Sequence, residues 1–208
     1  MKWMLPVAAA LAPVLTGCSV YREATSSRLP AGANWQTIAT DSDRSRIRNW
    51  RKTWDAALPL AQKADGGAIA RDPLLFDPDR ALGDAMPPAG AYRCRMFKLG
   101  ENGTATRDFA AFPAFDCRIA DEGEVKSLNK LGGTQRPTGL IFADSNARAI
   151  FLGTMVLGDE TSPLRYGLDS KRDMVGYIER IAPKRWRLVL PRPRFESILD
   201  VVELVPAP

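Results

Sequence analysis

Histidine is absent from the 208 residues, and cysteine occurs only three times. Without histidine, the Ser-His-Asp and Cys-His catalytic arrangements and most zinc sites are excluded. The sequence also has no G-x-S-x-G segment, no Walker loop and no dinucleotide-binding fingerprint. We therefore expect a protein that is not an enzyme and that uses no metal ion and no other cofactor.

The overall composition is that of an ordinary globular chain. Apolar residues make up 45% and charged residues 25%, which excludes both disorder and a polytopic membrane protein. This length predicts one domain with a short N-terminal attachment. The formal net charge of +5 suits nucleic acid as well as an anionic envelope surface. The N-terminal leader described next predicts export from the cytoplasm, so nucleic acid is not an expected partner.

Residues 1–17 have the pattern of a signal peptide, because Lys2 is followed by a short apolar run and then by small residues. The run is shorter than the about 20 apolar residues of a membrane-spanning helix. The tetrad LTGC that ends at Cys18 resembles the lipobox of bacterial lipoproteins, in which the cysteine is diacylated, the leader is cut before it, and its new amine is acylated. Because Ser19 stands where inner-membrane retention uses aspartate, we expect an outer-membrane lipoprotein facing the periplasm. The alternative is an ordinary secretory signal with a chance cysteine.

Cys94 and Cys117 remain as an even pair once Cys18 is lipidated. A disulfide is the default state of such a pair in an oxidising periplasm. A metal site would instead require closely spaced cysteines or histidines. We therefore predict a disulfide between Cys94 and Cys117.

Four segments follow one another along the chain: a signal peptide at 1–17, an acylated flexible tether at 18–40, a helix with a Pro-rich connector at 41–89, and a β domain at 90–208. The helix is predicted to be amphipathic. Its apolar face consists of Ile47, Trp50, Trp54, Leu58 and Ala61. Its other face carries cations that either contact anionic headgroups or simply face solvent, namely Arg44, Arg46, Arg48, Arg51 and Lys52. Pro59 is expected to kink or end the helix, and residues 65–67 (DGG) to stop it.

From Gly90 onward the pattern has a period of two, as in a half-buried strand: Tyr92 and Cys94 alternate with Arg93 and Arg95. Turn signals recur at regular spacing through the rest of the chain. They separate about eight short strands, one of them at residues 164–166. The predicted fold is mainly β with an N-terminal α-helix, as an antiparallel lipocalin-like barrel or, alternatively, a β-sandwich.

A cationic stretch near the C-terminus is the first candidate binding site. A strand here would direct its arginines outward, and guanidinium groups pair well with phosphate or carboxylate. The competing interpretation is a solvated barrel exterior. The residues concerned are Arg185, Trp186, Arg187, Arg192 and Arg194.

The barrel interior is the second candidate site, since a barrel of this size either fills its interior or holds one small molecule. The residues expected to line such a cavity are Tyr92, Phe151, Met155, Tyr177 and Trp186. Paired carboxylates suggest a third possibility, a hydrolase of envelope glycans. The candidate acids are Asp116, Asp121, Glu122, Glu124, Asp159 and Glu160.

Several of these segments together resemble an uncharacterised family. They are the helix around Trp50 and Trp54, the stretch from Gly90 to Arg95, residues 176–180 (GYIER) and residues 186–191 (WRLVLP). The combination is similar to domain-of-unknown-function family 4893, from α-proteobacterial envelopes. This resemblance implies localisation in the cell envelope and a fold, but it implies no activity, ligand or catalytic residue. A fainter similarity is to lipocalin-like periplasmic metalloprotease inhibitors, at the level of fold alone.

The sequence therefore predicts a non-enzymatic envelope module. Its partners would be the membrane, through acyl chains on Cys18, and either a lipidic or anionic ligand or an envelope protein. A periplasmic protease inhibitor and a carboxylate-based hydrolase are the alternatives.

Overall fold

The computed structural model describes residues 34–103 and 107–208. The predicted signal peptide, Cys18 and the tether up to residue 33 lie outside the described residues. Residues 32–208 make up one compact unit. No helix of the described part is both long enough and apolar enough to cross a membrane.

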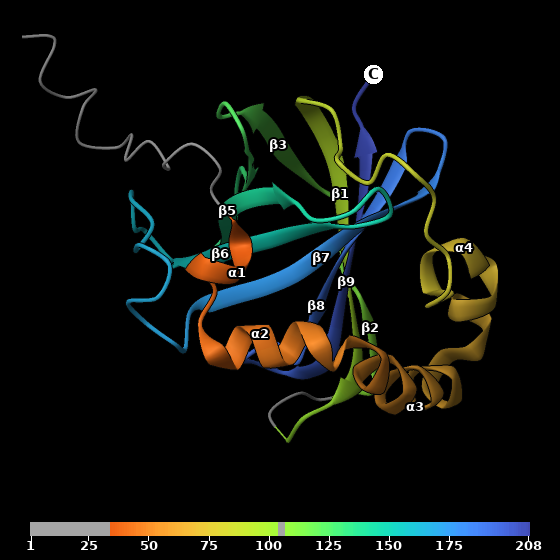
Figure 1. Cartoon of the computed structure of the whole chain (residues 1–208). Coiled ribbons are helices and arrows are strands. Elements are labelled where there is room, and N and C mark those ends of the chain that lie inside the picture. The colour runs from red at the N-terminus through yellow and green to blue at the C-terminus, as the bar shows by residue number, and fades with distance from the viewer. Residues whose placement is uncertain (1–33, 104–106) are drawn as a thin grey trace, which may run out of the picture. The chain divides into compact units, whose positions relative to one another are not determined.

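An antiparallel sheet closes on itself because its first strand pairs with its last (Figure 1). On its other edge, β1 pairs with β3 along residues 90–94 and with β2 along residues 97–99. These two short strands thus act as halves of one barrel strand, which gives the predicted eight-stranded barrel. The strands are β1 (Gly90–Glu101), β2 (Phe109–Ala111), β3 (Phe115–Asp121), β4 (Lys126–Lys130), β5 (Gln135–Ala143), β6 (Ala149–Leu157), β7 (Asp173–Ala182), β8 (Arg185–Pro191) and β9 (Ser197–Pro206). The strand expected at 164–166 is wrong, because these residues belong to the long β6–β7 loop.

The alternation predicted for β1 is present. Tyr92 and Cys94 are buried in the interior, whereas Arg93 and Arg95 are exposed. The register sets Tyr92 opposite Cys117, so Cys94 lies one diagonal step from Cys117 on the neighbouring strand. The two cysteines form the predicted disulfide, with their Cα atoms 6.2 Å apart.

The barrel interior is filled with apolar side chains. The rings of Tyr92 and Trp186 meet edge to face, with centroids 6.4 Å apart. Phe151 packs over Gly139 and Gly153, where an added Cβ would come within 2.8 Å of its ring. These glycines let a large ring occupy the centre, so the middle of the barrel is a packed core and not a cup.

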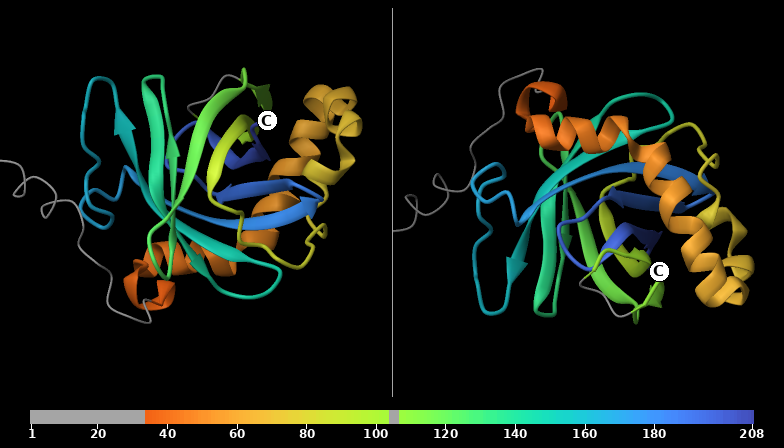
Figure 2. Two further views of the ribbon diagram at one scale, coloured as in Figure 1. Left: turned by 90° about the horizontal axis from the view of Figure 1, so that it is seen from above. Right: turned by 90° about the horizontal axis from the view of Figure 1, so that it is seen from below.

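Helices cross the outside of the barrel one after another (Figure 2). They are α1 (Trp35–Ile38), α2 (Asp41–Arg48), α3 (Trp50–Arg71) and α4 (Pro73–Phe76). Helix α1 lies within the stretch predicted as tether, and it is held there because Trp35 Nε1 donates to Asp144 Oδ1 at 2.7 Å. The single predicted helix is two helices, since Asn49 interrupts the chain between α2 and α3.

The expected end of the long helix is partly wrong. Pro59 lies inside α3, on an exposed face where water can reach the carbonyl that loses its partner. Asp65 leaves the helical conformation, with φ −151° and ψ 73°. Its side chain then accepts a hydrogen bond from the amide of Ala68 at 2.8 Å. Asp65 therefore ends one helical segment and caps the next, which continues to Arg71.

One end of the barrel is closed by the connector between α4 and β1. Leu82 bridges to Arg180 of β7, and the Trp186 indole donates to the carbonyl of Asp84. The Tyr92 hydroxyl donates to the carbonyl of Pro88 at 2.7 Å. Access to the interior is thereby left to the opposite end.

Candidate functional site

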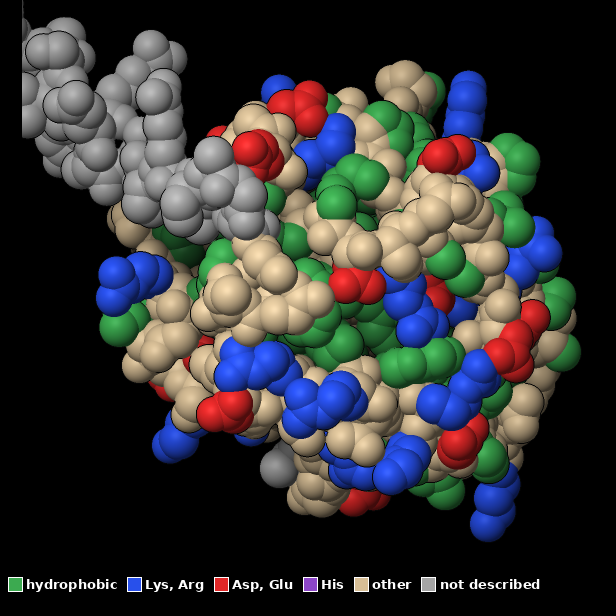
Figure 3. Space-filling view, viewed as in Figure 1, with side chains coloured by type: hydrophobic (Ala, Val, Ile, Leu, Met, Phe, Trp, Pro, Cys, Tyr) green, Lys and Arg blue, Asp and Glu red, His purple; other side chains and the backbone are tan. Residues whose placement is uncertain are grey.

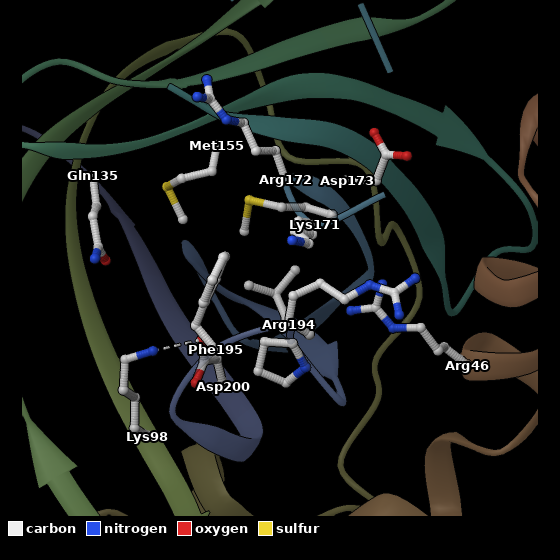
Figure 4. Close-up of a pocket in the computed structure, with 13 residues that line it drawn as sticks. Arg46, Lys98, Gln135, Met155, Lys171, Arg172, Asp173, Arg194, Phe195 and Asp200 are labelled. Atoms are coloured by element: carbon white, nitrogen blue, oxygen red, sulfur yellow. Dashed lines mark hydrogen bonds and ion pairs between the residues drawn. The ribbon is translucent and has the colours of Figure 1, made fainter. Parts of the chain in front are cut away.

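A pocket lies at the end of the barrel opposite the connector, between the β6–β7 loop, the β8–β9 turn and α2 (Figure 4). We call it the mouth pocket. Its apolar lining consists of Met155, Met174, Leu190, Pro193 and Phe195. Its polar lining consists of Arg46, Lys98, Gln135, Lys171, Arg172, Asp173, Arg194 and Asp200. The free volume of about 30 Å³ holds one or two water molecules. A larger ligand must therefore displace side chains such as Phe195, which stands half exposed at the entrance.

Charge in the mouth pocket is predominantly positive. Five of its lining side chains are cations and two are carboxylates. A cleft lined mainly by one sign of charge concentrates ions of the opposite sign. The apolar lining adds a surface that water wets poorly. The arrangement suits an anionic group attached to an apolar body.

On one side of the pocket, Lys98 faces Asp200. The two residues are direct partners across β1 and β9, and both point into the barrel. Lys98 Nζ lies 3.1 Å from Asp200 Oδ2 and 3.4 Å from Glu196 Oε2. Burial raises the pKa of the Asp200 carboxyl, while the charge of Lys98 and hydrogen bonds from Ser197 and Lys98 act against that rise. The ammonium of Lys98 is therefore held between two carboxylates within the protein.

On the other side, Arg46 and Arg194 bring their guanidinium groups together (Figure 4). Arg46 is buried, donating to Asp43 Oδ1 at 2.7 Å and to the carbonyl of Pro191 at 2.9 Å. Burial lowers the pKa of Arg46, and the neighbouring Arg194 acts in the same direction. The prediction that Arg46 faces solvent is wrong, because α2 turns this side chain toward the barrel.

Asp43 joins this side of the pocket to the long loop. The Tyr166 hydroxyl donates to Asp43 Oδ2 at 2.5 Å and accepts from the amide of Thr40 at 3.1 Å. Asp43 is fully buried. Burial and the charge of Asp43 raise the pKa of Tyr166, so this hydroxyl stays protonated and can donate. The network fixes α2 against the β6–β7 loop at the edge of the pocket.

The helices cover part of the predicted cationic surface. Arg187 points out of the barrel but is completely buried beneath α3 and α4, where it pairs with Glu179. Arg185 is half-buried and pairs with Asp72 and Glu203. Trp186 lies inside the packed core. The expectation of outward arginines in solvent is thus wrong for Arg187.

Two other predicted residues, Arg192 and Arg194, lie beyond this covered region, in the β8–β9 turn. Arg192 is exposed, with a φ of 48°, and Arg194 lines the mouth pocket. In the space-filling view, Lys and Arg side chains gather over the lower part of the visible face, where α2 and α3 run (Figure 3). Arg48 and Lys52 are exposed cations of these two helices.

The residues predicted to line a cavity divide into three groups. Tyr92, Phe151 and Trp186 point inward but belong to the packed core. Met155 lies at the mouth pocket. The prediction for Tyr177 is wrong, because its side chain faces outward and its hydroxyl accepts from Trp54 of α3.

Sequence reasoning missed Lys98 and Asp200. Lys98 continues the inward series of Tyr92, Cys94 and Met96 on β1, so a cation at that position was a signal of a polar site inside the barrel. Asp200 gave the same kind of signal, since it interrupts the apolar run of β9. Arg46 and Lys171 carried no such signal, because only the tertiary structure brings them to the pocket.

The candidate carboxylates are dispersed. Asp121 and Glu122 lie where β3 ends, whereas Asp159 and Glu160 follow β6 at the opposite end of the barrel. Asp116 pairs with Arg93, and the remaining candidate, Glu124, lies in the β3–β4 turn. Within residues 34–103 and 107–208, no three His, Cys, Asp or Glu side chains gather as a metal site would require.

Comparisons with known proteins agree with the resemblance drawn from the sequence. The curated proteins and the solved structures give no match. A family model described as "Domain of unknown function (DUF4893)" matches residues 35–204, from α1 to the last residues of β9. The match covers the helices, the whole barrel and the mouth pocket, and the chain belongs to this family.

Proposed function

We propose that this protein is a non-enzymatic binding module of the cell envelope whose mouth pocket takes the anionic group of a small or lipidic molecule. The observation that carries the proposal is the excess of cations over carboxylates around an apolar lining. The carboxylates of the pocket are already engaged within the protein: Asp200 by Lys98, and Asp173 by the amide of Gly167. Lys171 and Arg194 are thus left to receive a ligand.

Lys171 and Arg194 differ from the other cations of the pocket in how firmly they are held. Lys171 forms no ion pair within the described part of the chain. Arg194 makes one hydrogen bond to the Ser42 hydroxyl, and its closest carboxylate oxygen, on Asp43, is 4.0 Å away. A hydrogen bond to a charged group is worth about 1.5–3 kcal/mol. Binding an anion therefore costs Lys171 no internal ion pair and costs Arg194 at most its one hydrogen bond to Ser42.

The test is calorimetric titration of residues 32–208 with dodecyl phosphate below its micelle concentration, with dodecyl maltoside as the uncharged probe of equal chain length. We expect dodecyl phosphate to bind and dodecyl maltoside not to bind. The double variant Lys171→Gln/Arg194→Gln should weaken binding about tenfold or more. The control Lys52→Gln/Lys63→Gln, on the helices, should bind as the unaltered protein does. Equal binding of the two probes, or of the two double variants, would contradict the proposal.

The second part of the proposal concerns the localisation of the protein. Acyl chains on Cys18 would hold the domain at the outer membrane, facing the periplasm, where an envelope protein is a further possible partner and nucleic acid is not. The support is the lipobox-like tetrad LTGC behind the apolar leader. Mass spectrometry of the N-terminal peptide from membranes should find an acylated Cys18, and Cys18→Ala should leave the leader uncleaved. An unmodified cysteine at the mature N-terminus would contradict it.

A further inference from the structure

Three loops at the mouth end expose large apolar side chains. Leu131 in the β4–β5 turn is 58% exposed, and Leu164 and Leu168 in the β6–β7 loop are 39% and 62% exposed. We call these three leucines the apolar rim. None of them lines the mouth pocket. Phe195 of the β8–β9 turn, 47% exposed, adds a fourth apolar side chain at the same end.

The strand order explains why these side chains share one end of the barrel. Each of the three connections follows an even-numbered strand (β4, β6 or β8) of the antiparallel sheet, so all leave the end opposite the connector. Hydrogen bonds join two of them directly: Gly158 donates to the carbonyl of Thr134, and Arg136 donates to the carbonyls of Gly133 and Glu160. The β6–β7 loop projects on the left of Figure 1, away from the connector. The leucines therefore stand on loops held beside one another.

Unpaired cations accompany the rim. Arg165, Lys171 and Arg192 are exposed, and their side chains form no ion pair within the described residues. The acids of the β6–β7 loop are mostly neutralised within it: Arg172 lies 2.6 Å from Glu160 and 3.5 Å from Asp169. Positive charge is thus left facing outward beside the leucines.

Exposed leucines next to unpaired cations are the composition of a surface that binds an anionic bilayer. Apolar side chains enter the boundary between headgroups and acyl chains, while Lys and Arg remain among the anionic headgroups. We propose that the apolar rim with Arg165, Lys171 and Arg192 docks the barrel, mouth first, on an anionic lipid bilayer. This surface shares only Lys171 with the mouth pocket, and the docking does not depend on Cys18. It would bring the pocket to the level of the headgroups.

Co-sedimentation with lipid vesicles tests the docking. The protein is residues 32–208, which lack Cys18 and make up one compact unit. We expect binding to vesicles of equal parts phosphatidylcholine and phosphatidylglycerol, weakening as salt rises, and little binding to pure phosphatidylcholine. The triple variant Leu131→Ser/Leu164→Ser/Leu168→Ser should lower the partition coefficient at least tenfold. Arg165→Gln/Arg192→Gln should lower it about thirtyfold on the anionic vesicles alone, since two cations near the surface together contribute about 2 kcal/mol.

Matched controls exist on the helices. Leu60 of α3 and Leu74 of α4 are each 37% exposed, close to the exposure of Leu164. Leu60→Ser/Leu74→Ser should leave vesicle binding unchanged. Loss of binding in this control equal to that of the rim variant would overturn the proposal, as would equal binding to both kinds of vesicle or no binding at all. Because the rim leucines lie outside the pocket, the rim variant should still bind dodecyl phosphate, so docking and pocket binding fail separately.

Discussion

The indole Nε1 of Trp54 donates a hydrogen bond to the hydroxyl of Tyr177 at 2.7 Å, joining α3 to the outer face of β7. Both side chains are about 1% exposed. Trp50 meets the same tyrosine ring edge to face, with centroids 5.5 Å apart. Arg148 lies over the rings of both Trp50 and Tyr177. Trp50 and Trp54 therefore pack α3 against the outer face of the barrel, and the hydrogen bond fixes where α3 crosses β7.

Tyr177→Phe is expected to lower the free energy of unfolding by about 1–3 kcal/mol, because it leaves the buried Trp54 indole without an acceptor. The measurement is urea unfolding followed by circular dichroism. Trp54→Phe/Tyr177→Phe completes a double-mutant cycle, in which the hydrogen bond appears as a coupling between the two changes. Additive effects of the two substitutions would show that the bond does not stabilise the docking of α3.

Arg187 and Glu179 form a second link between barrel and helices. Their side chains are 2.7 Å apart and completely buried. Arg187 also donates to the carbonyls of Leu75, Asp77 and Arg80, so it satisfies the backbone of α4 and of the following turn. The guanidinium group thereby supplies hydrogen-bond donors to backbone carbonyls that, in a regular helix or strand, would be paired with backbone amides.

Arg187→Met should therefore cost about 3 kcal/mol or more of unfolding free energy, because three carbonyls lose their donor at about 1–3 kcal/mol each, while Glu179 keeps its ion pair with Arg148 at 2.7 Å. The control is Arg93→Gln, whose ion pair with Asp116 is exposed and should contribute at most about 1 kcal/mol. Should Arg187→Met not fold, Arg187→Lys retains the charge but cannot reach all three carbonyls, and a measurable loss is still expected. Equal stability of the Arg93 and Arg187 variants would contradict the assignment.

The barrel itself was predictable because its signals are local. Alternation in β1 and recurrent turn residues specify strands and hairpins without reference to the rest of the chain. The disulfide followed from the count of cysteines and the expected compartment. Closure by β1 and β9 required only that about eight such strands be arranged in sequence.

The errors arose where tertiary contacts decide which face is covered. A period of two separates the faces of a strand but does not say that a helix covers the outer one. Alternation alone therefore predicts Tyr177 in the cavity and Arg187 in solvent, whereas both side chains lie beneath the helices. A signal was present nonetheless: residues 188–190 of β8 (LVL) form an uninterrupted apolar run, which is typical of a strand buried on both faces. The mouth pocket was harder to predict, because it draws on α2, β1, β9 and two loops.

Removal of the disulfide is expected to reduce stability without changing the fold. In the chain-entropy account, a bond that closes a loop of about 24 residues stabilises by about 3 kcal/mol, because it restricts the unfolded chain. Cys94→Ala/Cys117→Ala should show this loss in urea unfolding. The reduced form of the unaltered protein should lose a similar amount, and the double variant should not respond to reductant. Unchanged stability in the double variant would mean that the bond contributes nothing to the folded domain.

The buried carboxyl of Asp200 predicts a pH dependence of stability. Burial raises its folded-state pKa above the ordinary value of 3.8. A carboxyl whose pKa is raised by folding stabilises the folded state while protonated, and this contribution is lost as pH rises from 3.8 through the raised pKa. Asp200→Asn should therefore flatten the fall in unfolding free energy over this range, a fall of at most about 1.4 kcal/mol per pH unit for one group. Some slope should remain, because burial also raises the pKa of Asp173.

Urea unfolding at a series of pH values from the ordinary aspartate value toward neutrality measures that slope. The matched control is Asp159→Asn, an exposed carboxylate of the β6–β7 loop at the same end of the barrel, which should leave the slope unchanged. Because Lys98 would lose its closest carboxylate in Asp200→Asn, that variant should also bind dodecyl phosphate more tightly at neutral pH, with Glu196 as the remaining partner of the ammonium. An unaltered slope together with unaltered binding would mean that Asp200 neither responds to pH nor restrains the cations of the mouth pocket.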